Sequence, residues 1–132
     1  MNEQQFLQTI LLLPVHDIQE STDWYADMLG FETVYVHSGD REEEPDNYAI
    51  LQRDTAVVHL ILDEAPDDER AWAKAGTGYL YLIVRDVEEV FAEVQSRGIK
   101  ITRGLQREDW PARGFNFSDP SGNDIHFEQP ID

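Results

Sequence analysis

The chain has 132 residues, with 27 Asp and Glu against 10 Lys and Arg and a formal net charge of −17. This length suits one domain with its own core, and the absence of cysteine excludes disulfides and thiol catalysis. A charge this negative opposes binding to nucleic acid or to an anionic membrane surface, and it attracts cations. No apolar run approaches the ~20 residues of a membrane helix, and the N-terminus lacks the basic region of a signal peptide. We therefore expect an acidic, cytoplasmic protein.

The first half of the chain has the pattern of a strand, a helix and three further strands. Residues 1–8 are mostly polar and are expected to form an arm. The apolar run Ile10–Leu13 predicts a buried strand. Asp17 follows as a helix N-cap with Glu20 in the capping-box position, and Gly30 is the expected C-cap. The β-prone stretches that come next are residues 31–36, 48–52 and 56–62.

The second half repeats this order after a connection over residues 63–78. Tyr79–Val84 predicts a strand, Asp86 a helix N-cap and Gly98 the end of that helix. The local sequence Val58-His59-Leu60 matches Ile125-His126-Phe127, and Val15-His16-Asp17-Ile18 matches Val84-Arg85-Asp86-Val87 at nearly the same offset. We therefore predict an α+β fold within a single domain, residues 1–132. Two tandem βαβββ units, at about residues 9–62 and 79–129, are expected to form a curved mixed sheet around a groove.

The last two strands are predicted to form a hairpin with one apolar face and one polar face. Phe115 and Phe117 alternate with small or polar residues, which is the period of a half-buried strand. The turn residues of the segment 119–123 separate them from a second alternating stretch. The polar face is expected to carry Asn116, Asp124 and His126. Trp110 and Arg113 stand just before the hairpin.

This hairpin carries a resemblance to a known family. The pattern of Trp110, then Arg113-Gly114-Phe115, then Asp119-Pro120-x-Gly122-Asn123-x-Ile125-His126-Phe127, resembles the C-terminal hairpin of bleomycin-resistance proteins. These belong to the glyoxalase/bleomycin-resistance/dioxygenase, or vicinal oxygen chelate, superfamily. Trp24-Tyr25, Leu29-Gly30-Phe31 and the Arg53-Asp54 turn extend the resemblance over almost the whole chain. It implies a homodimer with ligand sites at or near the interface, and antibiotic resistance as a biological role.

The resemblance also raises the question of a metal. Metal-using relatives place one ligand on each of four strands, and here those positions are Ile10, His59, Tyr79 and His126. Ile10 has no ligand atom and Tyr79 is a poor ligand unless ionised, whereas a catalytic site usually has three protein ligands and a water. A carboxylate from Glu128 or Asp124 would be needed beside the two histidines. The alternative function is therefore a divalent-metal-dependent lyase, isomerase or dioxygenase.

Our first expectation is a metal-free binding protein, not an enzyme, that sequesters a cationic or aromatic small molecule. The acidic stretches 40–46 and 63–69 would attract the ligand, and Trp110 would stack on it. Aromatic faces attract cations by ~0.5–2 kcal/mol each. The expected ligand-binding residues are Trp110, His59, His126, Tyr48, Tyr79, Tyr81, Arg113 and Asn116. The identity of the ligand stays open. A third possibility also stays open, namely that the groove is vestigial and the domain serves only in assembly.

Overall fold

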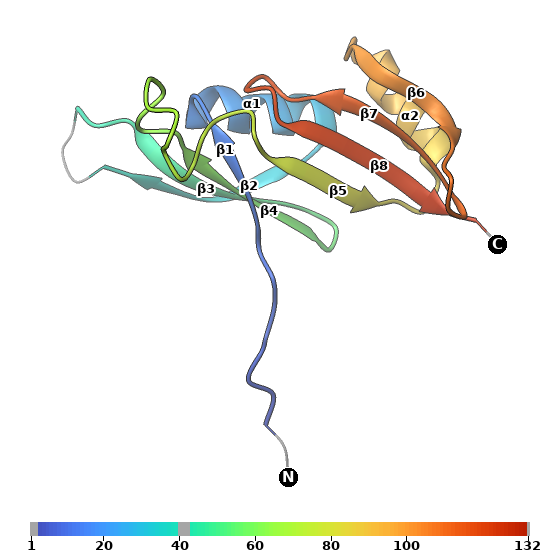
Figure 1. Ribbon diagram of the computed structural model, residues 1–132, viewed down its shortest axis with the longest axis horizontal. Helices are drawn as coiled ribbons and strands as arrows, with labels where there is room; N and C mark the ends of the chain where they lie inside the picture. The colour runs from blue at the N-terminus through green and yellow to red at the C-terminus, as the bar shows by residue number, and fades with distance from the viewer. Residues whose placement is uncertain (1–2, 40–42, 132) are drawn as a thin grey trace.

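The computed structural model describes residues 3–39 and 43–131, in which one βαβββ order is used twice. The first module contains β1 (Leu11–Val15), α1 (Ile18–Leu29), β2 (Glu32–Ser38), β3 (Asp46–Arg53) and β4 (Ala56–Leu62). The second module contains β5 (Tyr79–Ile83), α2 (Val87–Ser96), β6 (Ile101–Arg107), β7 (Ala112–Ser118) and β8 (Asp124–Pro130). The two modules lie side by side along the long axis of the molecule (Figure 1).

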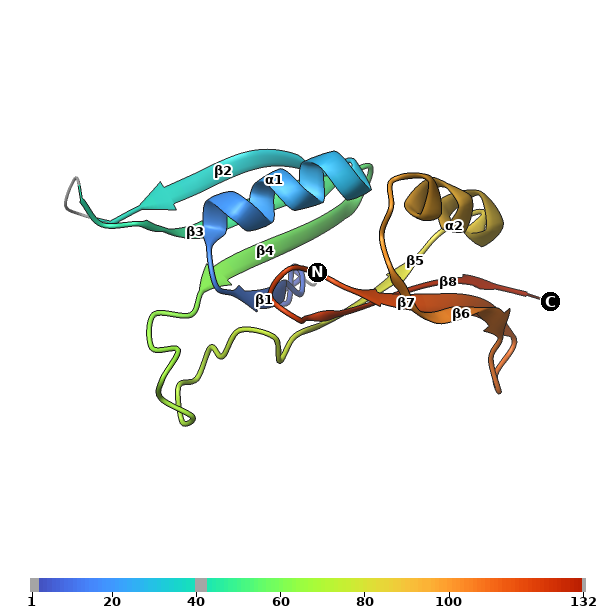
Figure 2. The same cartoon turned by 90° about the horizontal axis from the view of Figure 1, so that it is seen from above.

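The two sheets have the same topology. Their strand orders are β1-β4-β3-β2 and β5-β8-β7-β6, and in each sheet the first pair is parallel and the others are antiparallel. The register is equivalent as well, because Leu12 lies opposite His59 and Tyr81 lies opposite His126. This confirms the predicted α+β fold of two βαβββ units. In the described residues, however, the strands form two four-stranded sheets that meet where β1 contacts β5, and not one continuous sheet (Figure 2).

Both helices begin where the capping residues predict and α1 ends at the predicted Gly30, whereas α2 ends at Ser96 with Arg97 as its C-cap, one residue before the predicted Gly98. The Asp17 side chain accepts a hydrogen bond from the Glu20 backbone N at 2.8 Å, and Asp86 accepts one from Glu89 N at 3.1 Å. Each bond satisfies a backbone donor that has no partner within its helix. Gly30 ends α1 with φ = 71°, a left-handed conformation that glycine adopts without steric cost.

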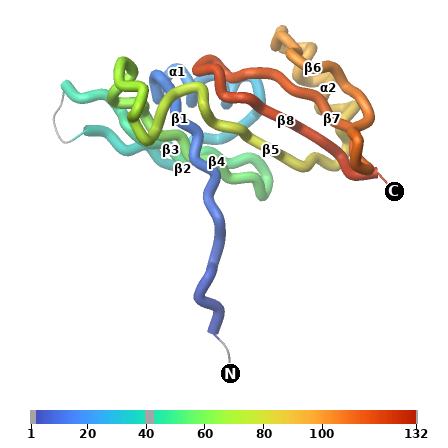
Figure 3. The backbone as a smooth tube through the Cα atoms, in the orientation of Figure 1, coloured from blue at the N-terminus to red at the C-terminus, as the bar shows by residue number. Residues whose placement is uncertain are grey.

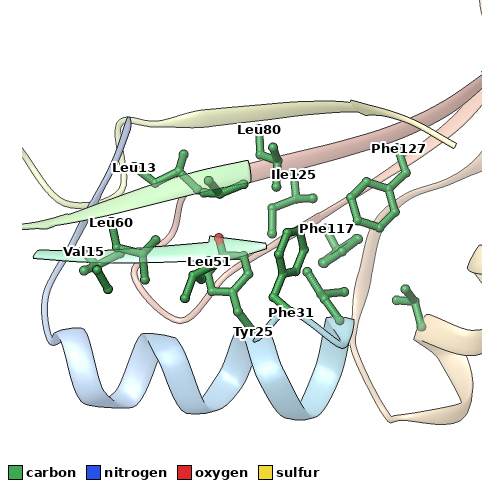
Figure 4. Packing of buried hydrophobic residues seen from close by; sticks show 14 of the residues in the cluster. Leu13, Val15, Tyr25, Phe31, Leu51, Leu60, Leu80, Phe117, Ile125 and Phe127 are labelled. Carbon is green, nitrogen blue, oxygen red and sulfur yellow. The ribbon is translucent and has the colours of Figure 1, made fainter. Parts of the chain in front are cut away.

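One hydrophobic core extends through both modules. Tyr25 of α1 lies among Leu13, Leu51 and other side chains of the first sheet, and Phe117 of the second sheet joins the same cluster (Figure 4). The ring of Trp24 lies 6.2 Å from that of Phe117, measured between centroids. Because α1 packs on residues of both modules, the modules share their stabilising apolar contacts.

A buried polar network fastens the β7–β8 turn to the first module. Asn123 is fully buried, and its Nδ2 donates to the backbone oxygen of Pro14 at 2.7 Å and to Asp119 at 3.0 Å. Its Oδ1 accepts a hydrogen bond from the Gly78 backbone N at 2.7 Å. Tyr25 Oη donates to Asp119 at 2.8 Å, and burial followed by the Asp119 charge raises the pKa of Tyr25 well above its ordinary value. The turn therefore holds β1, α1 and the inter-module connection together.

The N-terminal segment stands apart from this core. It extends away from both sheets, and within it the side chain of Phe6 is 98% exposed and that of Leu7 is 81% exposed (Figures 1 and 3). Neither helix of the described chain has the length and apolar character needed to cross a membrane.

The network around Asn123 gives a prediction about stability. We expect Asn123→Ala to lower the free energy of unfolding by about 2–4 kcal/mol, because it removes three hydrogen bonds and leaves buried partners unsatisfied. Urea denaturation monitored by circular dichroism measures the change. Asn47→Ala is the matched control, since the Asn47 side chain bonds the exposed His37 and its loss should change stability by less than about 0.5 kcal/mol. Equal midpoints for the two variants would contradict the structural role of Asn123.

Candidate functional site

The second sheet has an open face, opposite the face that packs into the core. Strand alternation directs Phe115, Phe117 and Phe127 into the core. The residues between them point to the other side, where register pairs His126 with Asn116 on β7 and with Tyr81 on β5. We define the open face of the second module as Tyr79, Tyr81, Asn116, Asp124, His126 and Glu128, together with Trp110 from the β6–β7 loop.

Glu128 is the centre of a buried hydrogen-bond network on this face. Its carboxylate lies 2.8 Å from His126 Nε2, and Trp110 Nε1 lies 3.3 Å from each of its two oxygens. Burial alone would raise the pKa of Glu128, but hydrogen bonds from Tyr81, His126 and Trp110 outweigh it, and the pKa lies below its ordinary value. Glu128 is therefore an ionised, fully partnered carboxylate.

Two aromatic rings are held at their polar ends by the same carboxylate. The hydrogen bond to Glu128, with burial and the Glu128 charge, raises the pKa of Tyr81 to about 12. Trp110 and Tyr81 nevertheless expose 47% and 48% of their surface, and Tyr79 exposes 47%. The centroids of the Tyr79 and Tyr81 rings are 6.4 Å apart. The network thus fixes the rings while their faces stay open to solvent.

His126 lies between two oxygen acceptors. Its Nδ1 is 2.9 Å from Asn116 Oδ1, and its Nε2 is 2.8 Å from Glu128 Oε1. The amide orientation of Asn116 is supported on both sides, since Arg103 approaches Oδ1 at 3.4 Å and Nδ2 donates to Asp124 at 3.2 Å. Both histidine contacts are hydrogen bonds only when both ring nitrogens carry hydrogen.

Glu108 completes the network, and it was not among the site residues predicted from the sequence. It is buried in the β6–β7 loop, it forms an ion pair with Arg103, and its Oε2 lies 3.7 Å from His126 Nε2. The hydrogen bond to Glu108 raises the pKa of Arg103 above its usual value. A Cβ atom on Gly114 would lie 2.8 Å from His126 Cε1 and 3.0 Å from Glu108 Oε2, so this glycine permits the approach. The sequence signal that could have indicated this contact was Gly114 itself, because a glycine inside a strand often marks the close approach of another group.

The first sheet has a different open face. His59 Nδ1 lies 2.6 Å from Tyr48 Oη, and the two rings meet edge to face. Beside them is a hollow of about 400 Å³, lined by Tyr35, His37, Asn47, Tyr48, Ile61, Leu62 and Glu64. A second hollow of about 680 Å³ adjoins the two acidic stretches, with Asp46 and Asp63 in its wall. Residues 40–42 of the first acidic stretch lie outside the described residues.

The structure brings together some of the predicted ligand-binding residues but not all of them. Trp110, Tyr81, His126 and Asn116 share the network of the second module, with Tyr79 beside them; His59 and Tyr48 form a separate pair in the first module. Arg113 forms an ion pair with Glu88 of α2, so it lies on the helix side of the sheet and not on the open face.

One group of side chains has the composition of a metal site. In the described residues, Glu108, His126 and Glu128 offer ligand atoms that all lie within 4.8 Å of one another. His59 does not belong to this group. One histidine and two carboxylates are ligand types that divalent transition metals accept.

Comparisons with known proteins agree with this architecture. Residues 7–127 match the model of the family described as Glyoxalase/Bleomycin resistance protein/Dioxygenase superfamily. The bleomycin resistance protein of Geobacillus stearothermophilus is 30% identical over 141 residues, which cover 95% of this chain and 98% of that protein. The crystal structure of TnmS3, an antibiotic binding protein from Streptomyces sp. CB03234, has a TM-score of 0.70 and 25% identity, covering 96% of this chain and 99% of that one. A glyoxalase-related enzyme from Clostridium phytofermentans has the same fold, with a TM-score of 0.74, 15% identity and coverage of 98% and 100%.

Proposed function

Because the chain belongs to the glyoxalase/bleomycin resistance protein/dioxygenase superfamily, we propose that it is a metal-independent binding protein that sequesters a cationic or aromatic small molecule. The observation that carries this proposal is the half-exposed Trp110 ring, whose Nε1 is held by the buried Glu128 beside Tyr81. Rigid aromatic side chains with exposed faces are efficient ligand anchors, since little conformational entropy is lost on binding. The relatives named for bleomycin resistance and antibiotic binding support a ligand of this kind.

The state of the polar groups favours binding over catalysis. Glu128 already accepts hydrogen bonds from His126, Trp110 and Tyr81, and Arg103 occupies Glu108. A general base must have a free acceptor atom within hydrogen-bond reach of the substrate proton. Here the buried carboxylates accept hydrogen bonds from donors of the same network, so sequestration needs no rearrangement of the network, whereas proton transfer would.

We also propose that two copies form a homodimer, as the resemblance implies. In it, the open face of the first module, with Tyr48 and His59, would lie opposite the partner's open face of the second module. Exposed apolar side chains support a covering partner, and they include Phe6, Leu7, Ile10, Val34, Tyr35, Val36 and Val57. These side chains come from the N-terminal segment, β2 and β4, and a monomer rarely leaves so many large apolar groups in water.

Replacing Trp110 tests the binding proposal. We expect Trp110→Ala to weaken binding by ~1–3 kcal/mol, roughly a 5- to 150-fold rise in Kd, because an aromatic anchor for the ligand is lost. Isothermal titration calorimetry with metal-free bleomycin, and with ethidium as a planar aromatic cation, measures the change. Trp72→Ala is the matched control, since Trp72 lies in the connection between modules and is 80% exposed. Unchanged affinity in Trp110→Ala would remove the stacking role, and failure of both probes to bind would count against the proposed ligand class.

Subunit mixing tests the homodimer. We expect light scattering to give twice the 15.2 kDa mass of the chain. If each groove takes one module from each subunit, co-refolding the weakly binding His59→Ala and Trp110→Ala variants in equal amounts restores about a quarter of the sites to full affinity, because half of the dimers are mixed and each has one intact groove. A monomeric mass, or a mixture that binds no better than its two components, would contradict the shared groove.

The cluster of Glu108, His126 and Glu128 favours a second candidate function, that of a divalent-metal-dependent lyase, isomerase or dioxygenase. The four ligand positions implied by the family do not fit a metal, since Ile10 offers no ligand atom. The observed cluster fits only after rearrangement, because a metal would have to displace Arg103 from Glu108 and a proton from His126.

Elemental analysis separates the two functions. For protein purified without chelator and then incubated with Zn²⁺, Ni²⁺, Mn²⁺ or Fe²⁺, we expect a metal content well below one per chain, because Arg103 already neutralises Glu108. A ratio near one that is lost in Glu108→Gln would support the metal-dependent function and overturn the metal independence of the first. Glu64→Gln is a control for non-specific binding to the acidic surface, since Glu64 lies by the hollows of the first module.

A further inference from the structure

The chemistry beneath the aromatic rings of the second module narrows the class of ligand. Trp110 and Tyr81 donate through their polar edges to one carboxylate, Glu128, and their faces stay exposed. An aromatic face carries partial negative charge, and a donor bonded to an anion makes the ring more electron-rich. The buried charge itself adds to this, since a carboxylate shielded from water acts strongly at short range.

Carboxylates outnumber cationic groups around these rings. The acidic side chains are Glu108, Asp109, Asp124 and Glu128. The cationic side chains are Arg103, which is bonded to Glu108, and His126 when both of its nitrogens carry hydrogen. The net charge of these side chains is negative even when His126 is charged. A cation placed on the ring faces is therefore attracted by both the rings and the carboxylates.

The same network limits which cation fits. A primary ammonium or a guanidinium group loses water on binding and needs hydrogen-bond acceptors in return. The two buried carboxylates beneath the rings are occupied, because Glu128 accepts from three side chains and Glu108 accepts from Arg103. A fully alkylated ammonium group has no hydrogen to donate and loses no such bond.

We propose that Tyr79, Tyr81 and Trp110 form a subsite for a quaternary or otherwise alkylated ammonium group, and that Glu128 is the residue that positions and charges it. The inference rests on the proposed function only in placing a ligand on the open face of the second module. Burial of a cation among aromatic rings is worth more than contact with one exposed ring, because water is excluded from the contact. The proposal thus names the cationic part of the ligand by its chemistry.

Three small probes test this subsite on the full-length protein. Choline carries a trimethylammonium group, 3,3-dimethylbutan-1-ol has the same shape without the charge, and ethanolamine carries a primary ammonium. The readout is the indole N–H resonance of Trp110 in ¹⁵N-resolved spectra, identified with Trp110→Phe. We expect choline to shift this resonance at concentrations at least about 10-fold lower than either of the other probes, because of cation–π attraction and because the carboxylates directly beneath the rings are already bonded.

Variants separate the role of the charge from that of the fold. Glu128→Gln should reduce the preference for choline over the neutral alcohol to less than about 3-fold, while Glu88→Gln, which removes one carboxylate on the helix side, should leave it unchanged. Tyr81→Leu provides a second variant that keeps Glu128, and it should weaken choline binding by about 3- to 30-fold.

Each outcome decides between the two proposals. Equal shifts with choline and the neutral alcohol would overturn the ammonium subsite, and an unchanged preference in Glu128→Gln would overturn the role of Glu128. Bleomycin or ethidium binding without a preference for choline would leave the proposed function standing and remove this inference. A preference for choline without binding of either drug would support the subsite and contradict the proposed sequestration of such drugs.

Discussion

The arrangement of both modules depends on one buried carboxylate, that of Asp119. It accepts hydrogen bonds from Tyr25 Oη, from the backbone nitrogens of Ser121 and Asn123, and from Asn123 Nδ2. An isolated buried charge would cost several kcal/mol, and these four donors offset that cost. Because the donors come from α1 and from the β7–β8 turn, the same interaction that stabilises the charge sets the angle between the second sheet and the first module. The open face that presents Trp110 and Tyr81 is positioned as a consequence.

Local signals in the sequence were sufficient for most of the fold. Asp17, Gly30 and Asp86 bound the two helices because capping is decided by a few neighbouring backbone groups. The alternation around Phe115 and Phe117 placed Asn116, Asp124 and His126 on one face for the same reason, since strand geometry repeats every two residues. That alternation also places Arg113 on the side of the two phenylalanines, where it bonds Glu88. The family pattern, and not the strand period, had assigned Arg113 to the ligand.

The remainder of the site depends on contacts that no local pattern encodes. Glu108 approaches His126 because the β6–β7 loop folds back over β7 and because Gly114 leaves room beneath it. The internal repeat correctly made His59 and His126 equivalent strand positions, but equivalence in a repeat does not bring two residues together. His59 bonds Tyr48 on the first sheet and His126 bonds Glu128 on the second, because each module buries its polar groups with its own neighbours.

The division of polar groups between the two modules bears on how this fold is used for binding. The first module offers Tyr48, His59 and a hollow beside them, and the second offers a network that is satisfied internally and covered by half-exposed rings. A site whose buried carboxylates are already bonded selects ligands by shape, charge and aromatic contact, whereas a site with a free buried acceptor selects by hydrogen bonding. The net charge of −17 then contributes through attraction at long range, and the fixed rings over Glu128 contribute at short range. Recognition in such a site needs a ligand that combines positive charge with a surface that does not require hydrogen bonds.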